Sequence, residues 1–359
     1  MSYSWIRFRP KWFAFISLLS VWLIVACQNV IAPLPSQTVS APSTPRSTAT
    51  PETSLRDAPA TLATRPLPPV EAPILQLFDY DPLAPLDIED VSVVEMENGY
   101  SYREITYASP KGGRVPATLL VPTNSLGPFA GIILMHGLPG DRKDNSSFAR
   151  GLVMTGAVVL MIDAPFARPE NRSRSNWPLT FDKTDRLEQI QLMVDLRRGV
   201  DLLVAREDVD SERLAYIGYS YGAAMGGLLA GIEPRIKAFG LMVGDGGIVS
   251  HFTTADGTLF SELNSLSEEE RKNWLGLMEP IEPIRFVGRA APASLFFQNA
   301  LWDEAVARDD ALAYQAAGSE PKRIEWYESG HFLPREAFRR MIDWLETEID
   351  IDATRFTGP

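Results

Sequence analysis

The stretch Leu214-Ala215-Tyr216-Ile217-Gly218-Tyr219-Ser220-Tyr221-Gly222 is the part of the sequence that decides the fold. Its first four residues form a short apolar run typical of a buried strand, and the small residues from Ala223 onward suit a closely packed helix. A G-x-S-x-G motif between a strand and a helix holds its serine in a strained turn, with the hydroxyl exposed above the sheet. The flanking glycines are needed because side chains two residues on either side of Ser220 would collide. The motif alone leaves a second interpretation open, a glycine-rich turn with an idle serine.

Short apolar runs alternate with helix-length segments from about Ile74 onward. This alternation predicts an α/β fold with a mostly parallel central sheet and helices on both faces. Strands covered on both faces are expected at 132–135, 157–162, 214–217, 239–243 and 293–297, with a further strand at 323–327. Two alternating segments, 102–108 and 115–121, predict an edge hairpin that turns at Lys111-Gly112-Gly113.

Helices are predicted between these strands. Apolar residues follow helical spacing in 184–206 and again near the end of the chain, where Pro334 stands at the start of the last helix. Residues 245–290, after the sixth predicted strand, are less regular, although Ser267 and Glu270 have the spacing of a capping box. We interpret 245–290 as an irregular insertion, a candidate lid over a site.

Composition and charge exclude several classes of protein. The chain has 359 residues, of which 45% are hydrophobic and 22% charged, so its apolar content is sufficient for a folded core. A formal net charge of −12 argues against nucleic acid as a partner, because phosphate binding relies on a basic surface. Cys27 is the only cysteine, which leaves no intramolecular disulfide and no thiolate cluster for a metal. No cofactor or metal ion is predicted.

Residues 1–26 have the organisation of a signal peptide. A basic start precedes fifteen uncharged residues, 12–26, which are fewer than the roughly 20 that a membrane-spanning helix needs. This core ends in Ile24-Val25-Ala26-Cys27, which resembles the bacterial lipoprotein box, in which the cysteine is lipidated and becomes the mature N-terminus. The alternative is an uncleaved apolar anchor with an incidental cysteine. We favour lipidation because the chain's only cysteine stands where that chemistry requires it.

The segment that follows Cys27 is predicted to be a disordered tether. Residues 28–73 contain ten prolines and twelve serines or threonines without apolar periodicity, so they cannot bury a core. Proline-rich segments of this kind are extended and semi-rigid. The expected organisation is a signal peptide at 1–26, a lipidated cysteine and tether at 27–73, and one folded domain at 74–359. The expected location is extracytoplasmic, on a membrane surface.

Few side chains are available to activate Ser220, since the sequence has three histidines. His331 follows the predicted strand 323–327 on a loop that can reach the carboxyl edge of the sheet, and we predict that it is the general base. His136 leads into Gly137-Leu138-Pro139-Gly140, a turn whose backbone N–H groups can face a developing oxyanion. His251 falls in the irregular insertion and is assigned no role.

An acid is needed to hold the tautomer of the histidine and to stabilise its cation. Asp303 follows the predicted strand 293–297 on a loop at the same edge of the sheet, and the order serine, aspartate, histidine is the one expected of this architecture. The alternatives are its neighbours Glu304, Asp309 and Asp310 and, more seriously, Asp245 at the end of strand 239–243.

These motifs, together with Trp302-Asp303-Glu304-Ala305-Val306 and Gly330-His331, resemble the α/β-hydrolase superfamily over roughly 101–348. The segment VDLRRGVDLL at 194–203 and the turn HGLPG at 136–140 look most like the dienelactone hydrolase-like and acetyl xylan esterase-like branch. The resemblance implies an α/β-hydrolase fold and ester hydrolysis at Ser220, with the N–H groups of Tyr221 and Leu138 as oxyanion donors. Two features depart from the pattern: dienelactone hydrolases use a cysteine nucleophile, and Tyr219 replaces a histidine often found before the serine.

The function predicted from the sequence is a membrane-tethered, extracytoplasmic serine esterase acting on a small-molecule ester, with a Ser220, His331 and Asp303 triad. One alternative is a peptidase or amidase of the prolyl oligopeptidase type, although 73 leading residues cannot supply its propeller domain. Another is a tethered binding protein with an inactive hydrolase fold. Five aromatic residues are candidates to line an apolar pocket: Phe166, Trp177, Phe252, Phe260 and Trp274.

Overall fold

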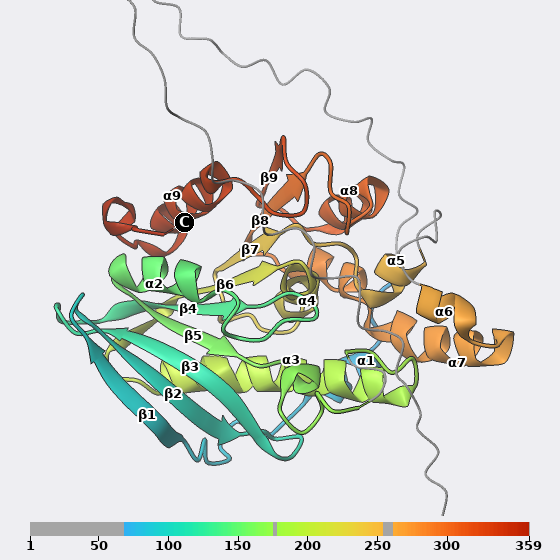
Figure 1. Cartoon of the computed structure of the whole chain (residues 1–359), viewed down its shortest axis with the longest axis horizontal. Coiled ribbons are helices and arrows are strands. Elements are labelled where there is room, and N and C mark those ends of the chain that lie inside the picture. Colours follow the sequence, from blue (N-terminus) through green and yellow to red (C-terminus); the bar gives the residue numbers. More distant parts are fainter. Residues whose placement is uncertain (1–67, 175–177, 254–260, 359) are drawn as a thin grey trace, which may run out of the picture. The chain divides into compact units, whose positions relative to one another are not determined.

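A central sheet with helices on both sides organises the computed structural model, which describes residues 68–174, 178–253 and 261–358 (Figure 1). Within these residues the sheet has nine strands in the order β1-β2-β3-β5-β4-β6-β7-β8-β9. The four strands β1, β2, β3 and β5 pair in antiparallel fashion, and all pairs from β5 to β9 are parallel. The prediction of an α/β fold with a mostly parallel sheet is confirmed.

Each predicted strand is present in the sheet. The strands are β1 (Glu89–Met96), β2 (Tyr100–Ala108), β3 (Arg114–Pro122), β4 (Phe129–Met135), β5 (Ala157–Ile162), β6 (Val209–Tyr219), β7 (Ala238–Met242), β8 (Ser294–Ala300) and β9 (Lys322–Tyr327). The edge strand β1 was not predicted. All eight of its residues are exposed, so its sequence shows no pattern of buried apolar residues. The insertion therefore follows the seventh strand and not the sixth.

Helices cover both faces of the sheet, which explains the continuous apolar runs in its central strands. The helices flanking the sheet are α2 (Ser146–Met154), α3 (Lys183–Val204), α4 (Tyr221–Ala230), α8 (Arg308–Ala317) and α9 (Arg335–Ile349). Figure 1 shows α2 and α9 on one side of the sheet and α3 on the other. In β5, Val158 and Leu160 pack in the core beneath α3, whereas Val159 and Met161 pack in the core beneath α2 and α9. The alternation of side chains along each strand thus supplies two separate cores.

The insertion between β7 and β8 is a set of short helices. They are α5 (Ile248–Phe252), α6 (Ser261–Ser265), α7 (Glu268–Met278) and the 3-10 turns Glu279–Ile281, Pro283–Arg285 and Val287–Arg289. The predicted capping box is present, because the Ser267 hydroxyl accepts from the Glu270 N–H and the Glu270 carboxylate accepts from the Ser267 N–H. Trp274 in α7 is 1% exposed, and its indole N–H donates to Asp185 of α3 at 2.8 Å. This contact fastens the insertion to the body.

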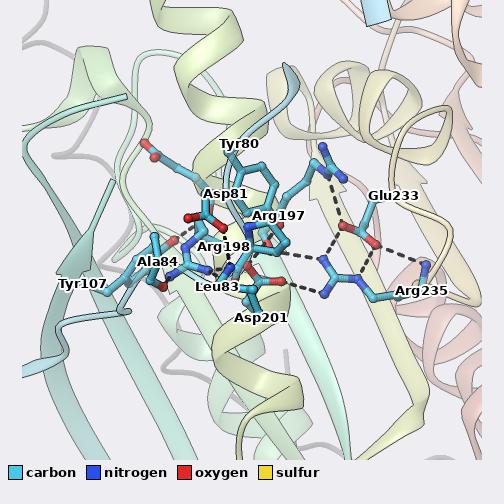
Figure 2. Close-up of polar contacts among 12 residues, drawn as sticks. Tyr80, Asp81, Leu83, Ala84, Tyr107, Arg197, Arg198, Asp201, Glu233 and Arg235 are labelled. Atoms are coloured by element: carbon cyan, nitrogen blue, oxygen red, sulfur yellow. Dashed lines mark hydrogen bonds and ion pairs between the residues drawn. The ribbon is translucent and has the colours of Figure 1, made fainter. Parts of the chain in front are cut away.

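The N-terminal segment of the domain is held on α3 by an arginine-rich network (Figure 2). The guanidinium of Arg197 donates to the carbonyl of Phe78 at 2.9 Å, and that of Arg198 donates to the carbonyl of Ala84 at 2.7 Å. The Tyr80 hydroxyl donates to Asp201 at 3.0 Å. The segment VDLRRGVDLL, noted in the sequence, therefore supplies the side chains that fix this polypeptide in place.

The described residues begin at 68, ahead of the predicted boundary at residue 74. Helix α1 (Ala72–Leu75) and the 3-10 turn Gln76–Phe78 start the domain, and Val70 ahead of them is 8% exposed and packs in the core. The short 3-10 turns Pro165–Ala167 and Ala353–Arg355 complete the element order. In the parts of the chain that the structure describes, no helix is both long enough and apolar enough to cross a membrane. The predicted signal peptide, Cys27 and most of the predicted tether lie outside those parts.

Candidate active site

Ser220 lies on a tight turn between β6 and α4. Its backbone has a φ of +54° and a ψ of −117°, a strained conformation for a residue with a side chain. A Cβ at Gly218 would lie 2.2 Å from the backbone of Gly222, and a Cβ at Gly222 would lie 2.6 Å from the Met135 carbonyl oxygen. Both glycines of the motif are therefore required by close backbone approach.

A hydrogen-bonded chain joins Ser220 to His331 and Asp303. The Ser220 Oγ lies 3.0 Å from His331 Nε2, and His331 Nδ1 lies 2.9 and 3.0 Å from the two Asp303 carboxylate oxygens. An ionised carboxylate only accepts, so the ring proton is on Nδ1 and Nε2 is left to accept the serine hydroxyl. The three residues follow β6, β8 and β9, whose carboxyl ends meet at one edge of the sheet. This arrangement can activate a serine hydroxyl for attack.

The Asp303 carboxylate is fixed by its own loop. Its Oδ1 also accepts from the backbone N–H groups of Ala305 and Val306, each at 2.9 Å. The Asp303 side chain is 5% exposed and that of His331 is 13% exposed, so both are shielded but His331 remains reachable from the cavity. Asp245, the alternative acid, forms its hydrogen bond to a different histidine, described below.

The other carboxylates near Asp303 have different positions. Glu304 accepts from the backbone N–H of His331 at 3.1 Å, so it helps to hold the loop that carries this histidine. Asp309 and Asp310 lie in the first turn of α8. Tyr219, at the position where the resembled family often has a histidine, donates its hydroxyl to the His331 carbonyl at 2.6 Å. Burial raises the pKa of Tyr219 to about 12, which keeps this donor protonated.

His136 organises the turn predicted to bind an oxyanion. Its Nδ1 lies 2.9 Å from the Gly137 carbonyl oxygen, and its Nε2 accepts from the Ala164 N–H at 3.1 Å. Burial lowers the pKa of His136 to about 4, so the ring is neutral at pH 7 and its single proton is on Nδ1, where it donates to Gly137. The Gly137 carbonyl and the Leu138 N–H belong to one trans peptide unit and point in opposite directions. The Leu138 N–H is thus aimed away from His136.

The turn and the nucleophile are close together. A Cβ placed on Gly137 would lie 3.2 Å from the Ser220 Cβ. Within the described residues, neither the Leu138 N–H nor the Tyr221 N–H donates a hydrogen bond. Both residues line the cavity that contains Ser220. These two N–H groups are therefore available to an oxygen bound beside Ser220.

Arg142 anchors the far end of the same turn. Its backbone N–H donates to Asp163 at 2.9 Å, and its guanidinium donates to Asp163, to Thr118 and to Glu104. The hydrogen bond and charge of this arginine outweigh burial and lower the pKa of Glu104. The turn is therefore fixed at both ends, by a neutral histidine and by a paired arginine.

A cavity of about 690 Å³ opens beside Ser220 and His331. Its described lining comes from the 138–139 turn, residues 178–181, the start of α4, the insertion and residues 305–306. The insertion thus contributes to the wall of this cavity, and its role as a lid stays a prediction. Of the five aromatic candidates, Phe252 lines the cavity, whereas Phe166 and Trp274 are buried outside its described lining. Trp177 and Phe260 lie outside the described residues.

The cavity also contains a histidine to which the sequence analysis gave no role. His251 Nδ1 lies 2.6 Å from the Asp245 carboxylate, and both residues line the cavity. In the sequence, Asp245 and His251 are six positions apart and are separated by Gly246-Gly247. This spacing is too common to predict a contact between them. Phe181, which also lines the cavity, was missed for a similar reason.

Known proteins provide a comparison for this fold and site. No family model matches the sequence. Residues of this chain are 28% identical over 155 positions to proteins named esterase FrsA from Yersinia pestis and Yersinia pseudotuberculosis, covering 42% of this chain and 33% of theirs. The chain therefore matches about a third of the length of these relatives.

Some solved structures share the fold of this chain but have little sequence identity with it. Acetyl xylan esterase 1 from Thermoanaerobacterium sp. JW/SL YS485 gives a TM-score of 0.64 at 16% identity, covering 76% of this chain and 91% of that one. An acetyl xylan esterase from Paenibacillus sp. R4 gives 0.60 at 18% identity, covering 77% and 92%. At these identities the likeness shows the fold. The chain has an α/β-hydrolase fold.

Proposed function

We propose that this protein hydrolyses carboxylic esters through an acyl-enzyme formed on Ser220. His331 Nε2 takes the hydroxyl proton as Ser220 attacks the carbonyl carbon, and it then gives that proton to the leaving alcohol. Asp303 keeps the proton of the neutral ring on Nδ1 and stabilises the imidazolium that forms. Water, activated by the same histidine, attacks the acyl-enzyme, which releases the acid and restores the serine.

The N–H groups of Leu138 and Tyr221 are the proposed donors to the tetrahedral oxyanion. Preorganised backbone donors act where charge develops in the transition state, and losing one costs about 100- to 1000-fold in kcat in known enzymes. His136 aligns the first of these donors, and the start of α4 supplies the second. The proposal is supported by the closeness of the turn to the nucleophile, since a Cβ placed on Gly137 would lie 3.2 Å from the Ser220 Cβ.

The observation that carries this proposal is the unbroken hydrogen-bonded sequence from Asp303 through His331 to the Ser220 Oγ at the wall of a cavity. A hydrolase fold without an intact site would specify no reaction, because function depends on the site and not on the fold. The partial sequence similarity to proteins named esterases supports esters as the substrate class. The serine esterase is preferred over the binding-protein alternative because all three side chains are present and in hydrogen-bond contact.

The test is turnover of p-nitrophenyl acetate and of the matched anilide by the wild type and by Ser220→Ala. We expect the wild type to cleave the ester much faster than the amide, and Ser220→Ala to lose ester hydrolysis while its circular dichroism stays unchanged. Wild-type turnover by a folded Ser220→Ala protein would contradict the proposal. Faster cleavage of the amide would favour the peptidase alternative.

We further propose that the enzyme is an extracytoplasmic lipoprotein held at a membrane by lipid on Cys27 and by the tether at 27–73. The support is the basic start, the short apolar core and the single cysteine after a branched-branched-small triplet. Two acyl chains give firm attachment whereas one binds only reversibly, and a diacylglycerol on the cysteine supplies two. Cys27→Ser should abolish labelling by a tagged fatty acid in cells. Label that persists on Cys27→Ser would refute this part of the proposal.

A chain that starts at Pro68 is the matched control for anchoring. It keeps Val70, which packs in the core, and it omits the predicted signal peptide and most of the tether. We expect it to remain in the supernatant after ultracentrifugation and to hydrolyse small soluble esters at the rate of the full-length protein. An insoluble or inactive product would show that the omitted residues contribute to folding.

A further inference from the structure

Ser220 is flanked by two tyrosines whose hydroxyls differ in what they contact. The Tyr219 hydroxyl donates to the His331 carbonyl at 2.6 Å and accepts from the Leu333 N–H at 3.2 Å, so its hydrogen bonds are made within the protein. The Tyr221 hydroxyl has no hydrogen-bond partner among the residues that the structure describes. Tyr221 is 8% exposed and lines the cavity beside Ser220. Its hydroxyl is therefore left for a molecule that enters the cavity.

The ring of Tyr221 is held in place by the core around it. Tyr221 is the first residue of α4, and its ring packs edge-on against Phe166 with the centroids 5.5 Å apart. Phe166 packs edge-on in turn against His136, with the centroids 5.7 Å apart. In the described part of the chain, the Tyr221 hydroxyl is not among the fully buried polar atoms that lack a partner, so a ligand can reach it. A phenol fixed in this way loses little side-chain entropy when it binds a ligand.

The direction of the hydroxyl follows from the carboxylates that act on it. Burial raises the pKa of Tyr221 above its ordinary value, and Glu188 and Asp185, both in α3, raise it further. Asp185 also accepts from the backbone N–H groups of Thr180 and Phe181, each at 2.8 Å, and these two residues line the cavity. The hydroxyl therefore lies toward this wall, on the α3 side of the cavity, and it keeps its proton at pH 7.

The wall near the hydroxyl offers few other groups for a polar ligand. Leu179 and Phe181 are apolar, and the Thr180 hydroxyl already donates to Asp182 and Asp185 at 2.8 and 2.9 Å. The described lining contains no lysine or arginine that would bind a carboxylate. A buried hydroxyl that faces an alkyl group stays unpaired, which is unfavourable, whereas a neutral oxygen satisfies it.

We infer that the Tyr221 hydroxyl is a specificity-determining group that donates a hydrogen bond to an uncharged oxygen of the substrate, such as an ether or hydroxyl oxygen away from the scissile ester. This inference rests on the proposed esterase function, and it names the class of ester as one that carries such an oxygen in its acyl or its alcohol part. The hydroxyl is separate from the oxyanion site, because the proposed oxyanion donor of Tyr221 is its backbone N–H, whereas its side chain extends toward α3. Two groups of one residue thus contact two different oxygens of the substrate.

The test compares esters in which one methylene is replaced by an ether oxygen, a change that preserves the length of the chain. The acyl series is p-nitrophenyl hexanoate and its ether analogues with oxygen at position 3, 4 or 5. The alcohol series is pentyl acetate, 2-ethoxyethyl acetate and 3-methoxypropyl acetate. The measurement is the ratio of kcat/KM for each ether ester to that for the plain ester of its series, in which a general change in activity or in the amount of folded protein cancels.

Two matched variants are compared with the wild type. Tyr221→Phe removes the hydroxyl but keeps the ring and the backbone N–H. Tyr219→Phe is the control, because it removes the other hydroxyl next to Ser220, which is bonded within the protein. We expect the ratio to fall by about three- to tenfold in Tyr221→Phe for at least one position of the oxygen, as for loss of one hydrogen bond, and to change by less than about twofold in Tyr219→Phe.

The outcomes separate this inference from the proposed function. The same ratios in the wild type and in Tyr221→Phe, at every position in both series, would overturn the inference while leaving the esterase function intact. An equal fall in Tyr219→Phe would also overturn it, because the effect would then arise from the turn at Ser220. If the wild type cleaves none of the esters, the esterase proposal fails, and this inference fails with it.

Binding without turnover provides a second measurement that does not depend on the activity of Tyr221→Phe. Ser220→Ala lacks the nucleophile, so dissociation constants for the same esters can be compared between Ser220→Ala and Ser220→Ala combined with Tyr221→Phe. The preference of Ser220→Ala for the ether ester over the plain ester should be reduced by about three- to tenfold in the double variant. An equal preference in the two proteins would overturn the inference.

Discussion

The neutral His136 should control kcat through the one peptide unit that it holds, although it does not touch the substrate. Two conservative variants separate its two hydrogen bonds. His136→Asn places an amide nitrogen near Nδ1, where it can still donate to the Gly137 carbonyl. His136→Gln places an amide oxygen near Nε2, where it can still accept from the Ala164 N–H. His136→Asn therefore preserves the alignment of the Leu138 N–H, and His136→Gln does not.

The size of the effect follows from what each variant releases. Complete loss of one oxyanion donor costs about 100- to 1000-fold in kcat. In His136→Gln the Leu138 N–H is still present, but the Gly137–Leu138 peptide unit is no longer held in position, so the loss should be smaller. We therefore expect kcat to fall by about 10- to 100-fold in His136→Gln and by less than about fivefold in His136→Asn, with KM little changed in both. His136→Asn instead leaves the buried Ala164 N–H unpaired, which should lower the free energy of unfolding by about 1 to 3 kcal/mol.

The assay is steady-state hydrolysis of p-nitrophenyl acetate, combined with urea unfolding of the same preparations. Because the pKa of His136 is about 4 in the folded protein and about 6.5 when unfolded, the unfolded state binds more protons between these values. Stability of the wild type should therefore decrease as the pH falls from 6.5 to 4, and both variants should lose this dependence. Equal kcat values for the two variants would refute the alignment of Leu138 by His136.

The remaining predictions concern the acids and the insertion. Asp303→Asn should lower kcat by about 10,000-fold, as loss of the corresponding aspartate does in other serine hydrolases. If Asp303→Asn kept its activity and Asp245→Asn lost it, the acid would be Asp245 instead. Glu282 retains its proton up to a pH of about 8 when folded but loses it near 4.5 when unfolded, so folding should weaken as the pH rises through this range. Glu282→Gln should remove that loss, on the order of 4 kcal/mol, in urea unfolding at pH 5 and pH 8.5. Trp274→Phe should lower the free energy of unfolding by about 1 to 3 kcal/mol, because Asp185 loses a buried donor, and an unchanged midpoint would contradict that contact.

The central strands were predictable because each contains a run of consecutive apolar residues. In β5 each residue faces one of two cores, so six apolar residues follow one another and only a buried strand or helix segment explains them. The turn at Ser220 was predictable because its glycines belong to one short motif, although they are required for different reasons: a Cβ at Gly218 would meet the backbone of Gly222, and a Cβ at Gly222 would meet the Met135 carbonyl of β4. Local sequence carries both signals, and both elements appear as expected.

Features that depend on contacts between distant segments were not predictable. Strand β1 pairs with β2 at the edge of the sheet, and its exposed side chains give no pattern against a core. The contact of Asp245 with His251 depends on how the chain turns after β7, which no motif specifies. The support of His331 by Tyr219 joins residues 112 positions apart. The sequence pointed to Ser220, Asp303 and His331 because strand order brings the ends of β6, β8 and β9 to one edge.

The most direct test of the proposed chemistry is to locate a covalent adduct after treatment with a fluorophosphonate probe. Such a probe reacts with an activated serine, and the hydrogen bond from the Ser220 hydroxyl to His331 is the arrangement that produces one. Mass spectrometry of the digested wild-type protein should show one stoichiometric adduct, on the peptide containing Ser220, and labelling should be lost in His331→Ala. An unlabelled Ser220 in folded wild-type protein, or equal labelling in His331→Ala, would contradict a serine hydrolase mechanism at this site.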